Sequence, residues 1–82
     1  MSRHEKLVER FKEIPADFEW NELESLLTGL GYKPVQGSGS RVRFVHESTR
    51  RKILLHKPHP EKTIKQVYLK QVKQHLEEVG LL

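Results

Sequence analysis

The sequence contains no cysteine, which excludes disulfide bonds, thiolate nucleophiles and cysteine-bound zinc together. No apolar run reaches the roughly 20 residues that a membrane-spanning helix needs. The first residues lack the apolar stretch of a signal peptide, so we expect a cytoplasmic protein. Hydrophobic residues make up only 35% of the 82 positions, which is typical of one compact domain with a thin core.

Charged residues are abundant, at 32% of the chain, and they are unevenly distributed. Residues 1–31 contain four Lys or Arg and seven Asp or Glu, whereas residues 32–82 contain eleven and four. The formal net charge of +4 is therefore the sum of an acidic first part and a strongly basic second part. A basic surface of this kind attracts a polyanion, and RNA or DNA is the natural partner. A solvated basic surface that serves solubility is the alternative.

Apolar residues recur at helical spacing in three segments, which predicts helices over residues 3–13, 19–30 and 63–79. Pro15 ends the first segment, which we interpret as an extension packed on the main body. Trp20 is expected to anchor the start of the second helix in the core. The residues expected to be buried are Leu23, Leu26, Leu27 and Leu30 in the second helix and Tyr68, Leu69, Val72, Leu76 and Val79 in the third.

Three short segments predict β-strands over Tyr32–Gln36, Arg41–His46 and Lys52–His56. Pro34 cannot donate a hydrogen bond to a neighbouring strand, so the first strand should lie at a sheet edge. Short turns between consecutive strands favour an antiparallel meander. The strand residues expected to face the core are Val42, Phe44, Ile53 and Leu55, with Arg41, Arg43 and Val45 on the opposite face.

The predicted fold class is therefore α+β, with the order α-β-β-β-α and an antiparallel three-stranded sheet. Both long helices should cover one face of the sheet and leave the other face to solvent. This is the dsRBD-like layout of a double-stranded-RNA-binding domain, preceded by an extra helix. We expect residues 1–16 to form the helical extension and residues 17–82 to form the domain.

The turn before the second predicted strand is suited to phosphate binding. Glycines around Ser38, Gly39 and Ser40 let backbone amides approach a phosphate closely. Arg41 and Arg43, on one face of the strand, present forked donors to an anion. The alternative interpretation is an ordinary hairpin turn.

The segment His56–Pro60 contains two histidines among lysines, and its two prolines predict a loop. His56 and His59 are better suited to acid–base catalysis or phosphate contact than to metal binding. The chain has no cysteine, and Glu61 is the one nearby carboxylate that could act as a ligand. Ordinary exposed histidines are the alternative. The lysines that would flank or steer a bound polyanion are Lys57, Lys62, Lys65 and Lys70, although such a run is equally typical of a solvated helix face.

Four short motifs, in order and spacing, together resemble the HicA toxin family of HicA/HicB toxin–antitoxin systems. They are Leu26–Tyr32, Gly39–Phe44, His59–Pro60, and Leu69–Val72 leading to Gly80 and Leu81. The resemblance covers about residues 20–82. It implies a dsRBD-like fold, mRNA as target and a HicB-type antitoxin as protein partner. It also implies a metal-independent endoribonuclease that uses the histidine of a Gly-Ser-His motif, with no metal and no small-molecule cofactor.

Arg41 stands where the resemblance implies the catalytic histidine. Arginine keeps its proton at physiological pH, so it is unsuited to the role of general base and better suited to holding the scissile phosphate. Cleavage would then require another histidine, His56 or His59 ahead of His46. The alternatives are a nucleic-acid-binding module without cleavage and a protein-interaction adaptor. The expected RNA-binding residues are Ser38, Gly39, Ser40, Arg41, Arg43, Lys57, Lys62, Lys65 and Lys70.

Overall fold

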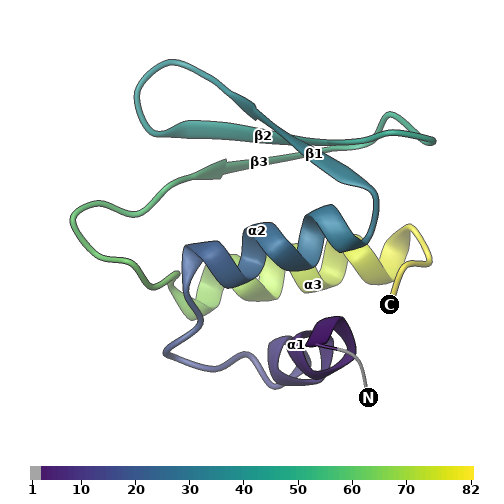
Figure 1. Cartoon of the computed structure of the whole chain (residues 1–82), viewed down its shortest axis with the longest axis horizontal. Helices are drawn as coiled ribbons and strands as arrows, with labels where there is room; N and C mark the ends of the chain where they lie inside the picture. The colour runs from purple at the N-terminus through teal and green to yellow at the C-terminus, as the bar shows by residue number, and fades with distance from the viewer. Residues whose placement is uncertain (1–2) are drawn as a thin grey trace.

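The computed structural model describes residues 3–82, which form three helices and three strands in the predicted order. The elements are α1 (Arg3–Lys12), α2 (Trp20–Gly29), β1 (Tyr32–Gln36), β2 (Arg41–His46), β3 (Lys52–His56) and α3 (Gln66–Glu78). Figure 1 shows α2 and α3 on one face of the sheet, with α1 beyond them on the side away from the sheet. The predicted α+β fold with an extra helix in front is confirmed.

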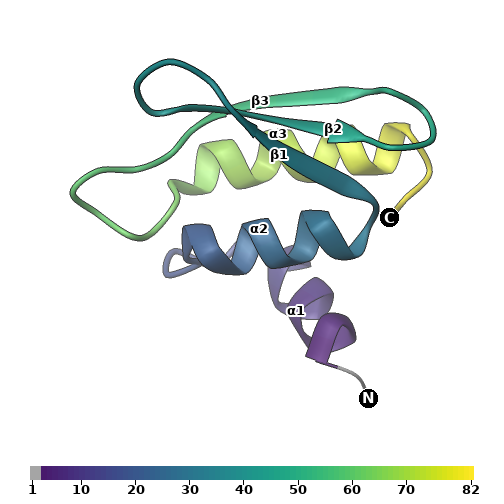
Figure 2. The same ribbon diagram turned by 45° about the horizontal axis from the view of Figure 1, so that its top comes forward.

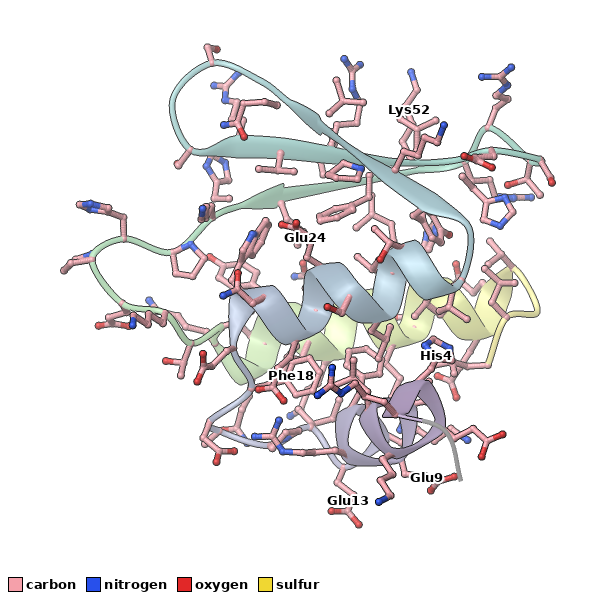
Figure 3. All side chains as sticks on the ribbon, viewed as in Figure 1. His4, Glu9, Glu13, Phe18, Glu24 and Lys52 are labelled. Carbon is pink, nitrogen blue, oxygen red and sulfur yellow. The ribbon has the colours of Figure 1, made fainter. Side chains whose placement is uncertain are left out.

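The sheet has the strand order β1-β2-β3, and both pairs are antiparallel. The three strands have their predicted bounds, and Pro34 lies in an edge strand as expected. The residues that face the helices are Tyr32, Val42, Phe44, Ile53 and Leu55, all buried. In the turned view of Figure 2, no described element covers the other face. Lys52 points outward from that face (Figure 3).

The core lies between the sheet and the two long helices. Its helical residues are Leu23, Leu26 and Leu27 from α2 and Leu69, Val72 and Leu76 from α3, all essentially inaccessible. Trp20 is 4% exposed and its ring centroid lies 5.8 Å from that of Phe44, so its predicted anchoring role is confirmed. No helix within residues 3–82 combines the length and the apolar character that crossing a bilayer requires.

The extra helix α1 is joined firmly to the rest of the molecule. Phe11 from α1 and Phe18 from the linker are fully buried, with ring centroids 5.7 Å apart. Figure 3 labels Phe18 between α1 and the two long helices. Arg10 pairs with Asp17 at 3.0 Å and also with Glu22 of α2. The predicted packing of this helix on the main body is therefore confirmed. Phe18 belongs to no periodic pattern, and the sequence gives no signal for its burial.

Helix α3 begins three residues later than predicted, because the residues before Gln66 are extended and paired. Thr63 forms an isolated antiparallel bridge with Glu19. The Ile64 amide donates to the Phe18 carbonyl at 2.9 Å, and the Trp20 amide donates to the Lys62 carbonyl at 2.9 Å. These bonds fasten the end of the β3–α3 loop to the start of α2.

Three predicted core residues are not fully buried: Leu30 and Val79 are half-buried, and Tyr68 is exposed. Tyr68 was expected in the buried stripe of α3, but its side chain is 46% exposed. It lies in the first turn of α3, where its neighbours are residues of the β3–α3 loop and not the underside of the sheet. The helical period alone therefore misplaces it.

Candidate nucleic-acid interface

The β1–β2 turn and the end of β3 lie at the same end of the sheet (Figure 1). There, Arg41 of β2 and His56 of β3 are direct partners in the strand register. The Lys57 amide donates to the Ser40 carbonyl at 2.8 Å, on the flank of this pair. That bond makes Arg41 and His56 a non-hydrogen-bonded pair, the type in which opposite side chains approach most closely. Both side chains are exposed on the outward face.

One ring nitrogen of His56 lies near a hydroxyl group, and the other is available for a hydrogen bond. The Ser40 hydroxyl lies 3.4 Å from His56 Nδ1. Within residues 3–82, His56 Nε2 has no hydrogen-bond partner. Nε2 is therefore the free ring nitrogen of His56, and Arg41 is the cross-strand neighbour of this residue.

The turn between β1 and β2 is closed by two backbone bonds. The Gly37 amide donates to the Arg41 carbonyl at 2.8 Å, and the Arg41 amide donates to the Ser38 carbonyl at 3.3 Å. Gly39 adopts a φ of 65°, a conformation that glycine adopts without strain. The amides of the three central residues have no acceptor within residues 3–82, and these residues are exposed. They are thus available to an anion, as the sequence predicts for Ser38, Gly39 and Ser40.

A depression of about 470 Å³ on the outward face joins the turn to the arginines and His56. Its floor includes Val35, Arg43 and Leu54, which occupy one row across the three strands. Leu54 is 75% exposed and Val35 is 41% exposed. Sequence reasoning did not single out these two apolar residues, although strand alternation places Leu54 outward once Ile53 and Leu55 face the core.

The β3–α3 loop forms a second depression that shares His56 with the first. Lys57, His59, Lys65 and Tyr68 line it as well. The structure therefore links the predicted arginines to the predicted histidine loop through His56. Lys62 lines a neighbouring depression together with Lys57, on the side of the loop that faces the start of α2.

A comparison with protein families gives the family of this chain. The family model of the HicA toxin of bacterial toxin–antitoxin systems matches residues 20–81. The chain belongs to the HicA toxin family. The match covers the sheet, α2 and α3 and leaves out α1. No curated protein and no solved structure matches the chain. HicA membership implies a toxin that is paired with an antitoxin protein.

Two other histidines of this HicA chain have structural roles. His46 Nε2 donates to the Leu30 carbonyl at 3.0 Å, and its Nδ1 accepts from the Ser48 amide at 3.2 Å. Both ring nitrogens are thus engaged, which argues against His46 as a base. His75 Nε2 lies 2.8 Å from the Tyr32 hydroxyl, and burial lowers the pKa of His75 and raises the pKa of Tyr32.

Lys70 lies apart from the other predicted RNA-binding residues. Gln66, Lys70 and Lys73 follow helical spacing and share one face of α3. That face turns toward α1, because Gln66 donates to the Ile14 carbonyl at 2.8 Å and Lys73 to the Lys12 carbonyl at 3.2 Å. The predicted role of Lys70 in RNA binding stays a prediction. No group of three or more His, Asp or Glu side chains within residues 3–82 is arranged to hold a metal ion.

Proposed function

We propose that this HicA toxin binds mRNA on the outward face of its sheet and cleaves it at the Arg41–His56 pair. The observation that carries the proposal is the register of β2 and β3, which sets an imidazole directly beside the arginine. In this arrangement β3 supplies the imidazole that the family motif supplies from β2. Arg41 takes the separate role of holding the phosphate.

The reaction is attack by the ribose 2′-hydroxyl on the adjacent phosphorus. His56 Nε2 accepts the 2′-hydroxyl proton as the 2′-oxygen–phosphorus bond forms. The bond from phosphorus to the 5′-oxygen breaks, and the imidazolium of His59 gives its proton to that leaving oxygen. The products are a 2′,3′-cyclic phosphate and a 5′-hydroxyl. Arg41 stabilises the charge that develops on the phosphoryl oxygens.

Several neighbouring groups support binding of the RNA backbone. Ser38 and the exposed Arg43 line the same depression as the reactive pair, and the unpaired amides of Gly39 and Ser40 follow Ser38 in the adjoining turn. Lys57 and Lys65 continue the positive surface around His59. Phosphate contacts of this type give affinity without sequence preference, and they weaken as salt rises.

Induction of the protein in cells, followed by growth and transcript integrity, tests the toxin claim. We expect growth arrest and mRNA fragments with 2′,3′-cyclic phosphate and 5′-hydroxyl ends. Normal growth with intact transcripts would remove the ribonuclease claim. Salt-sensitive binding of labelled RNA would then leave a binding module, and no binding even at low ionic strength would favour a protein-interaction adaptor.

A binding-only function is the second candidate, and one observation favours it. The observation is Arg41, which the resemblance implies in place of the family's histidine. An arginine there would strengthen phosphate contact and would leave β2 without a proton acceptor at that position. A chain of this kind would hold mRNA with the same salt dependence and release no cleaved ends.

A further inference from the structure

We propose that Tyr68 is a stacking platform for one unpaired nucleobase next to the reactive phosphate. This inference rests on the proposed function and deepens it, because it makes the substrate a single-stranded RNA with at least one base turned out of its stack. Tyr68 belongs to none of the sequence motifs and takes no part in the proposed chemistry.

Tyr68 is an aromatic side chain left without a structural task. It is 46% exposed, whereas the next residue, Leu69, is fully buried. Its backbone amide donates to the Lys65 carbonyl at 3.0 Å and so fixes it in the first turn of α3. Within residues 3–82 its hydroxyl has no hydrogen-bond partner and its ring has no aromatic neighbour. Tyr32, by contrast, is buried and bonded to His75.

The residues around Tyr68 are suited to binding a nucleotide. Tyr68 lines a depression of about 260 Å³ together with His56, Lys57, His59 and Lys65. The two lysines provide cations for the phosphates on either side of a base. Glu61 is the one acidic residue that lines this depression. Its carboxylate only accepts hydrogen bonds, so it would pair with a donor such as an exocyclic amine of a base.

His56 connects this depression to the reactive pair. It lines the depression around Tyr68 and also the one around Arg41. We expect the nucleotide next to a phosphate held at Arg41 and His56 to enter the depression that Tyr68 lines. Every base has a π-face, so stacking on tyrosine tolerates all sequences, but a base inside a duplex cannot present that face.

The test uses the full chain and a short single-stranded RNA with 2′-fluoro sugars, which binds but lacks the attacking hydroxyl. Affinity is measured by fluorescence anisotropy for wild type, Tyr68→Ala and Tyr68→Phe. Val67→Ala is the matched control, because Val67 is the preceding residue of α3, is 52% exposed and does not line the depression. Circular dichroism checks that each variant is folded.

We expect Tyr68→Ala to weaken binding by about tenfold, with Tyr68→Phe and Val67→Ala close to wild type. Removing single bases from the RNA one at a time should find one position where loss of the base weakens wild type but not Tyr68→Ala. If wild type binds and Tyr68→Ala binds equally well, the stacking site is overturned and the proposed function stands. If wild type binds no RNA, both are overturned.

Discussion

Arg41 and His56 face each other across β2 and β3 as a non-hydrogen-bonded pair on the open side of the sheet. The resemblance to the HicA motif implies a histidine at the position of Arg41, and the imidazole of His56 lies one strand away. In the proposed reaction, the cation that holds the phosphate and the base that accepts the 2′-hydroxyl proton therefore come from neighbouring strands.

The two lysines Lys65 and Lys70 provide a comparison on one helix. Lys65 lines the depression that contains His59, whereas Lys70 lies on the face of α3 that turns toward α1. We expect Lys65→Ala to lower RNA affinity and reduce the log–log salt slope by about 1, because one phosphate contact is lost. Lys70→Ala should leave the slope unchanged. The opposite ranking in a salt titration would place the RNA on another surface.

Phe11 tests whether α1 is part of one cooperative fold. Its side chain is fully buried against Phe18. Phe11→Ala should therefore lower the free energy of unfolding by about 3–5 kcal/mol, from lost burial and the cavity left behind. Leu7→Ala, which removes a partly buried neighbour on the same helix, should cost less. Urea unfolding should show one transition in both variants, and a separate transition for α1 would contradict this account.

Gly31 tests the positioning of His46. Gly31 has a φ of 98°, and a Cβ there would lie 2.9 Å from His46 Nε2, the atom that donates to the Leu30 carbonyl. Gly31→Ala should lower the free energy of unfolding by more than the roughly 1–2 kcal/mol of the left-handed conformation alone. Gly80→Ala is the control, since Gly80 has a φ of 80° and nothing within 4 Å of its added Cβ. Equal losses in chemical denaturation would show that no clash occurs.

His75 predicts a pH dependence of stability. Burial, and then the charge of Arg51, lower its pKa below its ordinary value of 6.5, with Glu78 acting in the opposite direction. The unfolded chain therefore binds more protons at this residue, so the stabilisation is complete above pH 6.5 and is lost as the pH falls through the lowered value.

His75→Gln removes this titration and can keep a hydrogen bond with Tyr32. We expect the free energy of unfolding of wild type to fall more steeply than that of His75→Gln between about pH 7 and pH 5. Urea titrations at a series of pH values measure the difference. Parallel curves for the two proteins would contradict the assigned cause.

The sequence predicted the layers of this fold well, because strand alternation and apolar stripes carry most of the information. The strand bounds agree with the structure, and Pro34 marks an edge strand. The predicted start of α3 was wrong, because Thr63 and Ile64 pair with the linker that precedes α2, which is distant in the sequence. Phe18 was missed for the same reason, since burial of a linker residue depends on contacts between elements that no local pattern records.

The candidate site was predicted as a set of residues and not as a geometry. Charge and residue type pointed to Arg41, His56 and His59, but the partnership of Arg41 with His56 depends on the register set by the β2–β3 turn. The exposure of Tyr68 depends on the path of the preceding loop, which two prolines make irregular. Spacing along the chain predicts neither this pairing nor the exposure of Tyr68.

The central claim is tested most directly by measuring RNA cleavage in a variant that has its histidine on β2 and not on β3. His56→Gln keeps a side chain that can bond to Ser40 but cannot accept a proton, and should slow RNA cleavage by at least about 10²-fold. Adding Arg41→His to that variant returns an imidazole to β2 and should restore cleavage in an assay for 2′,3′-cyclic phosphate ends. Wild-type rates in His56→Gln, or a double variant as inactive as the single one, would contradict the proposed reactive pair.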